Sequence, residues 1–184
     1  MPLVIAIIAV LMVLVIIYNS LINKKNQVEN VFGSVDAMLK KRYDLIPNLV
    51  STVQTYMQHE RGTLNELTEL RAKAISGGLT PDEKVDLDNR LSKTLGGIMV
   101  AVENYPDLKA NQNFLQLQGS LNEVEEQISA ARRAYNMAVT NYNNACEMFP
   151  TNVFASMMSY QRKKVFETSE AERQNINVKD LFNK

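Results

Sequence analysis

The chain has 184 residues, 46% of them hydrophobic, and its 20 basic and 20 acidic side chains cancel to a formal net charge of zero. This balance and a pI near 6.6 give no basic surface of the kind that binds nucleic acid. The single cysteine excludes an intramolecular disulfide and a cysteine-based zinc cage, and the low glycine and proline content favours an all-α domain.

The most apolar segment lies near the N-terminus. Leu3 to Ile17 is an uninterrupted apolar run, and twenty helical residues span about 30 Å, the thickness of the hydrocarbon core of a bilayer. Residues 3–22 are therefore predicted to form a transmembrane helix. A cleaved signal peptide and a buried core helix are the alternatives, but a signal peptide would carry a basic start and a small-residue cleavage site, and this segment has neither.

The basic residues nearest to the span all follow it. Lys24 and Lys25 come directly after the apolar run, and Lys40, Lys41 and Arg42 come later. The positive-inside rule then places the N-terminus outside and the C-terminal part of the chain in the cytoplasm.

After the span, residues 23–168 are predicted to form a helical bundle. Apolar residues recur at helical intervals over residues 23–75, and Pro47 within this stretch predicts a kink near residues 43–47. No linker rich in glycine, serine or proline separates this helix from the span. The membrane helix is therefore expected to run directly into the bundle.

The sharpest boundary follows Gly77-Gly78, which is expected to end that helix. Thr80 is predicted to cap the next helix, over residues 81–103, with Glu83 completing a capping box.

A long helix is predicted over residues 107–149, because apolar residues there follow alternating steps of three and four. This stripe consists of Phe114, Leu117, Leu121, Val124, Ile128, Ala131, Tyr135, Ala138, Tyr142, Ala145 and Phe149. A fourth helix is expected over residues 152–168, and residues 1–2 and 169–184 are expected to be tails. The predicted fold class is all-α: an N-terminal transmembrane helix continuing into a long antiparallel four-helix bundle.

Polar side chains crowd the helices of this bundle. Buried amides and guanidinium groups must be paired, so these residues predict either an interhelical network that fixes the register of the helices or a subunit interface. The candidates are Arg42, Asp44, Asn48, Arg132, Tyr135, Asn136, Tyr142 and Asn143. The neighbouring carboxylates Glu125 and Glu126 are expected to be solvated.

Catalytic chemistry is not predicted. His59 is the single histidine and has no second histidine at the spacing of a zinc helix, and Cys146 lies beside the apolar stripe like a small buried hydrophobe. The sequence therefore predicts no catalytic residues, no metal site, no cofactor and no small-molecule substrate.

Several motifs occur together in one order. Residues 42–50 read RYDLIPNLV, residues 105–110 read YPDLKA, residues 131–136 read ARRAYN, and Phe149-Pro150 follows. Over about residues 1–166 the chain resembles the bacterial LemA family, with Phe32 where a tryptophan is expected. The resemblance implies one N-terminal span and a long antiparallel helical bundle, with the N-terminus outside, and implies no established activity.

The leading functional hypothesis is a membrane-anchored scaffold without catalysis, whose protomers associate side by side into a homo-oligomer at the bacterial inner membrane. The expected partners are the lipid bilayer and further copies of the chain. The alternative is a signalling or adaptor protein whose bundle recruits a membrane protease, kinase or other envelope protein. An enzyme acting through His59 or Glu60 is the third hypothesis.

Overall fold

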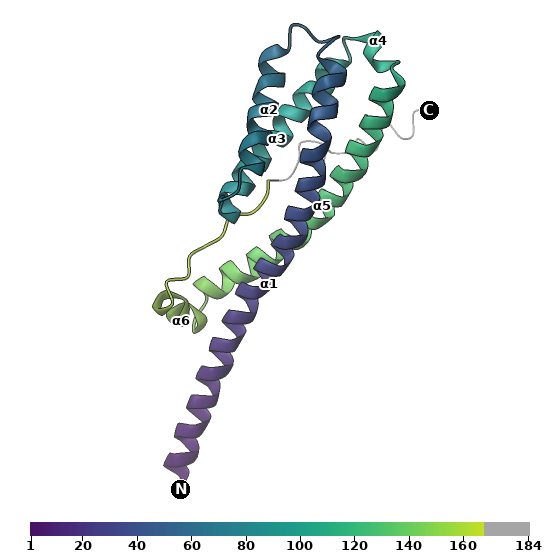
Figure 1. Ribbon diagram of the computed structural model, residues 1–184. Coiled ribbons are helices and arrows are strands. Elements are labelled where there is room, and N and C mark those ends of the chain that lie inside the picture. Colours follow the sequence, from purple (N-terminus) through teal and green to yellow (C-terminus); the bar gives the residue numbers. More distant parts are fainter. Residues whose placement is uncertain (168–184) are drawn as a thin grey trace, which may run out of the picture.

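The computed structural model describes residues 1–167, and the regular elements of this part are all α-helices (Figure 1). The helices are α1 (Pro2–Val53), α2 (Arg61–Ile75), α3 (Pro81–Val102), α4 (Pro106–Lys109), α5 (Gln112–Glu147) and α6 (Thr151–Met157). The tail predicted over residues 169–184 lies outside the described residues.

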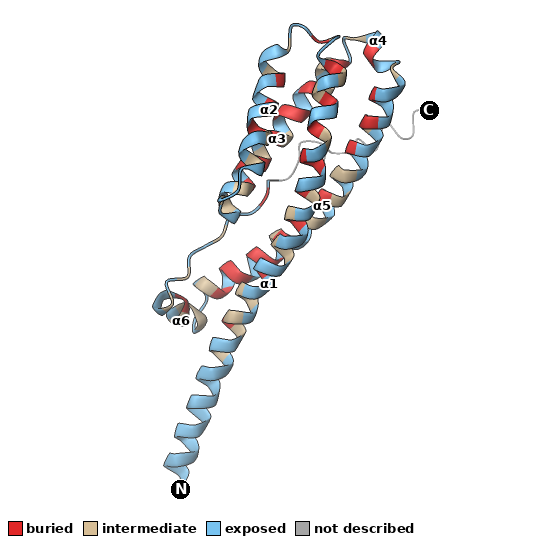
Figure 2. Ribbon diagram, viewed as in Figure 1, coloured by how far each residue is buried: buried red, intermediate tan, exposed pale blue. Residues whose placement is uncertain are grey.

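Helix α1 contains both the apolar segment and the first helix of the bundle. It runs for 52 residues without interruption, so the predicted direct connection is present, and Pro47 lies within it. Among residues 1–167 it is the one helix long and apolar enough to cross a membrane, and its apolar half stands clear of the bundle (Figure 2). This part of the chain thus carries one N-terminal membrane anchor.

The prediction of one helix over residues 23–75 is wrong. Helix α1 ends at Val53, and α2 begins at Arg61 and runs back along α1. The intervening turn is fixed by tertiary contacts: Met57 is fully buried, and the Tyr105 hydroxyl donates to the Glu60 carboxylate over 2.7 Å. Periodicity could not show this reversal, because the apolar spacing resumes on both sides of the turn.

The boundary before α3 is as predicted. Gly77 and Gly78 both have a φ of 78°, a left-handed conformation that suits glycine. The Glu83 backbone N–H donates to the Thr80 hydroxyl over 3.3 Å, and the Thr80 N–H donates to the Glu83 carboxylate over 2.8 Å. This is the expected capping box, and α3 ends one residue before the predicted limit.

The helix predicted over residues 107–149 is interrupted near its start. The Asn111 side chain accepts hydrogen bonds from the backbone N–H groups of Asn113 (2.9 Å) and Phe114 (3.1 Å), which makes it the N-cap of α5 and separates α4 from α5. The predicted stripe on α5 is buried or partly buried, with the exception of Phe149, which follows the helix and is exposed.

The fourth predicted helix, over residues 152–168, is also wrong in extent. Only Thr151–Met157 is helical, and the chain then runs without regular structure to residue 167. The reason is that side chains of α3 and α5 form hydrogen bonds with the backbone groups of this last segment.

Four helices form the bundle. Helix α5 packs along α1, and α2 and α3 form an antiparallel hairpin beside the distal half of this pair (Figure 1). The buried side chains of all four helices make one core (Figure 2). A second, small apolar cluster lies at the membrane-proximal end, where Leu21 of α1 packs with Ala145 of α5 and Ala155 of α6.

Candidate functional site

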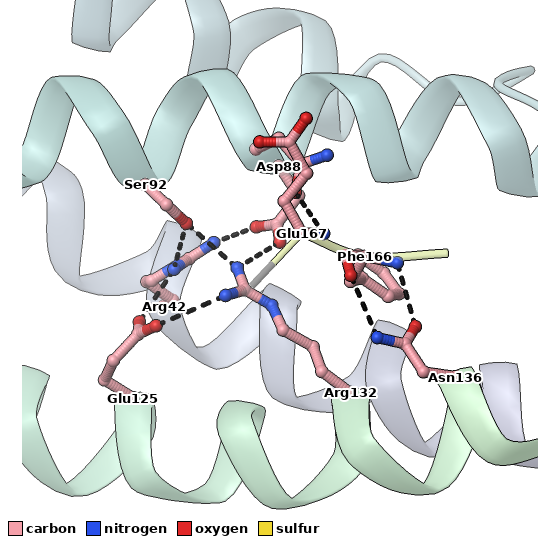
Figure 3. Close-up of polar contacts among 9 residues, drawn as sticks. Arg42, Asp88, Ser92, Glu125, Arg132, Asn136, Phe166 and Glu167 are labelled. Atoms are coloured by element: carbon pink, nitrogen blue, oxygen red, sulfur yellow. Dashed lines mark hydrogen bonds and ion pairs between the residues drawn. The ribbon is translucent and has the colours of Figure 1, made fainter. Parts of the chain in front are cut away.

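The main polar feature of the bundle is a buried ion cluster that joins three helices. Arg42 comes from α1, Asp88 and Ser92 come from α3, and Arg132 comes from α5 (Figure 3). The relative exposure is 1% for Arg42, 0% for Asp88 and 5% for Arg132. A fifth side chain, Glu125 of α5, reaches the cluster from its partly exposed edge.

Both guanidinium groups bind the same carboxylate. Arg42 donates to one oxygen of Asp88 and Arg132 donates to the other. The Ser92 hydroxyl accepts from Arg42 Nη1 over 3.0 Å and from Arg132 Nη2 over 2.9 Å. The Glu125 carboxylate lies 2.8 Å from Arg42 Nη1 and 3.6 Å from Arg132 Nη1.

The cluster balances two positive charges with two negative charges. Burial lowers the pKa of the Arg42 guanidinium, and the nearby Glu125 carboxylate opposes this shift. Removing a charge from water is costly, and the cost is offset only where each ion meets an opposite charge in good geometry. The cluster therefore fixes the relative positions of α1, α3 and α5 at one level of the bundle.

A second polar feature lies on α5 and holds the end of the described chain. Asn136 and Asn143 are seven residues apart, so they lie on one face of the helix. The Asn136 amide pairs with the backbone N–H and C=O of Phe166, each over 2.9 Å. The Asn143 amide pairs in the same way with Lys163, over 3.0 and 2.9 Å.

The same segment is bound from the other side by α3. The backbone N–H of Lys164 donates to the Asp82 carboxylate over 3.2 Å, and the backbone N–H of Glu167 donates to the Asn89 side chain over 3.3 Å. We call residues 163–167 the docked segment. It lies between α3 and α5 and closes the bundle there.

Phe166 connects the docked segment to the ion cluster. Its buried ring lies 5.5 Å from the Arg132 guanidinium carbon, a cation–π contact, and packs edge-on against the Tyr135 ring at a centroid distance of 5.3 Å. On its other side the Tyr135 ring meets Phe32, at 5.5 Å. Phe32, at the position where a tryptophan is expected, is thus part of this aromatic group.

The structure divides the eight candidate residues into four pairs. Arg42 and Arg132 meet in the ion cluster, and Asn136 and Asn143 bind the docked segment. Two tyrosines are buried in the core, and burial raises the pKa of Tyr135 to about 12 and also raises the pKa of Tyr142. The remaining two, Asp44 and Asn48, lie on the exposed side of α1, away from the cluster.

The expectation that the Glu125-Glu126 pair is simply solvated is wrong for Glu125, which binds Arg42. Asp88 and Ser92 were not among the candidates, although Asp88 stands on the apolar stripe of α3 between Val85 and Leu91. A charged residue on a core stripe must find a charged partner, and Arg42 and Arg132 stand on the stripes of their own helices. Their positions on core stripes could therefore have indicated from the sequence that Arg42, Asp88 and Arg132 form ion pairs with one another.

His59 and Cys146 lie in different parts of the bundle. His59 is exposed in the turn between α1 and α2, and Cys146 is partly buried beside the membrane-proximal cluster. Within residues 1–167 no group of three or more His, Cys, Asp or Glu side chains is placed to hold a metal ion.

The LemA family model matches residues 31–179. Protein LemA of Metamycoplasma hominis is 28% identical over 90% of this chain and 75% of its own length. Magnetosome protein MamQ 2 of Paramagnetospirillum magneticum is 22% identical over 97% of this chain and 75% of its own length, and magnetosome protein MamQ of Magnetospirillum gryphiswaldense is 20% identical over 91% and 71%.

The family match covers the ion cluster, both asparagines and the docked segment, as well as most of the bundle. Together with the uninterrupted α1, it identifies the chain as a membrane-anchored helical protein that belongs to the LemA family.

Proposed function

We propose that the protein is a scaffold without catalytic activity, whose single-span protomers associate side by side into a homo-oligomer at the bacterial inner membrane. The observation that carries the proposal is a shallow open groove along the distal part of α1 and the start of α5. It is lined by Leu45, Asn48, Ser51, Thr52, Asn113, Gln116, Leu117 and Ser120.

The chemistry of this groove suits another helix. None of its eight lining residues is charged: six have hydroxyl or amide side chains, and two are leucines. A neighbouring helix can therefore approach without desolvating an ion. The exposed amide of Asn48 and hydroxyl of Ser51 can form hydrogen bonds across the contact. A net charge of zero adds no long-range repulsion between copies.

The continuous α1 supports a side-by-side arrangement. Because one rigid helix spans the membrane and forms the bundle, every copy stands in the same orientation to the bilayer. Two copies in one membrane therefore bring the same groove to the same height. This favours cyclic association over random contacts.

We also propose that the bundle lies on the cytoplasmic side. Lys24 and Lys25 directly follow the span, which favours retention of this end in the cytoplasm. A reporter that is active only in the cytoplasm is expected to be active when it is fused after Lys184. Activity of a reporter that works only in the periplasm, fused at the same position, would show that the orientation is the opposite one.

The test of self-association is cross-linking in intact membranes. Cys146 is first replaced by serine, and a single cysteine is then introduced by Gln116→Cys in the groove or by Asn65→Cys on the exposed face of α2. A bis-maleimide reagent is expected to give a dimer band from Gln116→Cys and none from Asn65→Cys. Equal dimer yields from both positions, or monomers alone both in the cross-linked membranes and by native mass spectrometry of mild extracts, would contradict the proposal.

The adaptor hypothesis gives a different result in the same experiment. If the groove seats a helix of another membrane protein, Gln116→Cys is cross-linked to a foreign polypeptide in stoichiometric yield, and the product has a mass other than that of the dimer. Mass spectrometry of the product separates the two functions.

A further inference from the structure

The membrane-proximal corner of the bundle, between α5 and α6, exposes large apolar side chains. The relative exposure is 81% for Phe149 and 79% for Met157, and Met148 and Val153 are also at least half exposed. Val153 and Met157 are four residues apart on α6, so they lie on one face of that helix. Residues 148–160 include no Lys, Arg, Asp or Glu, so this apolar surface is not interrupted by charge.

The position of this corner is set by the membrane anchor. Leu21 lies in the last turn of the apolar segment and is fully buried against Ala145 and Ala155, which flank the corner on α5 and α6. Figure 1 shows α6 beside α1 at the point where the lone apolar part of α1 meets the bundle. The corner therefore lies at the level where α1 leaves the hydrocarbon core.

Charges surround the corner in the pattern of a membrane surface. Lys25 lies 5.9 Å above the ring of Tyr160, and Lys163 lies 5.9 Å above the ring of Tyr142. Glu29 pairs with Lys25 and Glu147 pairs with Arg162, so the excess of positive charge here comes from Lys24 and Lys163. Basic side chains at this level favour the negatively charged headgroups of a bilayer.

We propose that the α5–α6 corner is a second membrane contact, in which Met148, Phe149, Val153 and Met157 insert into the interfacial layer of the bilayer beside the anchor. The partner is lipid, because these large exposed apolar side chains stand at the level where the span leaves the hydrocarbon core and no charged residue interrupts them. An isolated soluble protein rarely exposes such a cluster of large apolar side chains. The contact adds a second point of attachment, so it fixes both the tilt of the bundle and its rotation about α1.

The experiment measures tryptophan fluorescence of the full chain. Because the chain contains no tryptophan, one introduced tryptophan is the source of all tryptophan emission. Phe149→Trp and Met157→Trp report on the corner. Val100→Trp is the matched water-exposed control, because Val100 is 72% exposed and lies in the last turn of α3, which ends near α4 at the distal end of the bundle (Figure 1). Leu11→Trp reports on the anchor itself.

Each variant is reconstituted in vesicles of phosphatidylethanolamine and phosphatidylglycerol, with and without lipids brominated on the acyl chain. The Phe149→Trp and Met157→Trp variants are expected to emit at shorter wavelength than Val100→Trp and to lose most of their emission to brominated lipid. Val100→Trp is expected to be quenched by aqueous iodide instead.

Two outcomes would overturn the proposal. Quenching of the corner tryptophans by iodide would show that the corner stands in water. Protection from both iodide and brominated lipid would show that protein, such as a second copy, covers the corner. Quenching of Leu11→Trp by brominated lipid in the same series shows that the anchor is inserted, so a failure at the corner is not confused with a failure of the anchor.

Discussion

The two ends of the bundle are stabilised differently. In the distal part, four helices enclose a large core, and the ion cluster joins three of them. At the membrane end of the part of the chain that the structure describes, α1, α5 and α6 meet around the small side chains of Ala145 and Ala155. The distal part provides its own interior, whereas the membrane end relies on its surroundings to cover its apolar surface.

This contrast follows from the solvent that each end meets. In water, helices with matching apolar stripes can slide past one another at little cost, and a buried ion pair selects one register. Beside a bilayer the anchor already fixes the position of α1, and apolar side chains at the corner cost little because lipid can cover them. The variants below test whether the two ends differ in this way, beginning with the largest expected effect.

Asp88→Asn is expected to have the largest effect on stability. It leaves the buried Arg42 and Arg132 without the carboxylate they share, which is expected to lower the free energy of unfolding by about 3–5 kcal/mol. The measurement is denaturant unfolding of the full chain in detergent, followed by circular dichroism.

The matched control is Asp86→Asn, two residues earlier on the same helix. Asp86 forms an exposed ion pair with Lys164, and the expected loss is at most about 1 kcal/mol. Equal effects of the two variants would mean that the ion cluster does not stabilise the distal part of the bundle.

A pair of leucine-to-alanine variants compares the two ends directly. Leu91 and Leu21 are both fully buried, the first in the distal core and the second at the membrane end. Leu91→Ala is expected to cost about 2–5 kcal/mol, because a closed core cannot refill the space. Leu21→Ala is expected to cost clearly less in lipid vesicles, because acyl chains can fill the space. Thermal unfolding in vesicles measures both variants, and equal destabilisation would mean that the two ends of the bundle do not differ in this way.

Asn143→Ala is expected to release one end of the docked segment. It removes two hydrogen bonds to the Lys163 backbone, and a buried polar group left without a partner costs about 1–3 kcal/mol. Hydrogen exchange should accelerate at the Lys163 amide, whereas Asn136→Ala should act at the Phe166 amide. The exposed neighbour Asn144 is the control: Asn144→Ala should leave both amides unchanged, and acceleration there would mean that the helix, not the amide pairing, is disturbed.

The sequence predicted the parts of this fold that depend on local signals. The all-α class, the continuity of α1, the Thr80–Glu83 capping box and the stripe on α5 follow from composition, spacing and capping chemistry. A further local signal, the N-cap Asn111, was present but lay inside an apparently continuous helical pattern. These features require no knowledge of which helices meet.

The features that the sequence did not predict depend on contacts between distant segments. The turn after Val53 is fixed by a hydrogen bond from Tyr105 to Glu60, and the end of α6 is set by asparagine side chains that pair with a backbone some twenty to thirty residues later. The spacing of apolar residues along the chain cannot show the turn after Val53 or the end of α6. The ion cluster is intermediate, because three of its four charged residues stand on core stripes, but their pairing requires the arrangement of the helices.

Tyr135→Phe is expected to have the smallest effect at neutral pH and a specific effect at high pH. No group within residues 1–167 forms a hydrogen bond with the buried Tyr135 hydroxyl, so its removal is expected to change the free energy of unfolding by no more than about 1 kcal/mol at pH 7. In the folded chain its pKa is raised to about 12 from 10.0, mainly by burial. The folded state therefore keeps the proton longer than the unfolded state, so this contribution to stability is complete below about pH 10 and is lost as the pH rises to about 12.

Denaturant unfolding across this range should show a shallower loss of stability in Tyr135→Phe than in the parent chain. Since Tyr142 is also buried with a raised pKa, the variant should remove only part of the slope, and parallel curves for variant and parent would mean that Tyr135 reaches solvent in the folded state.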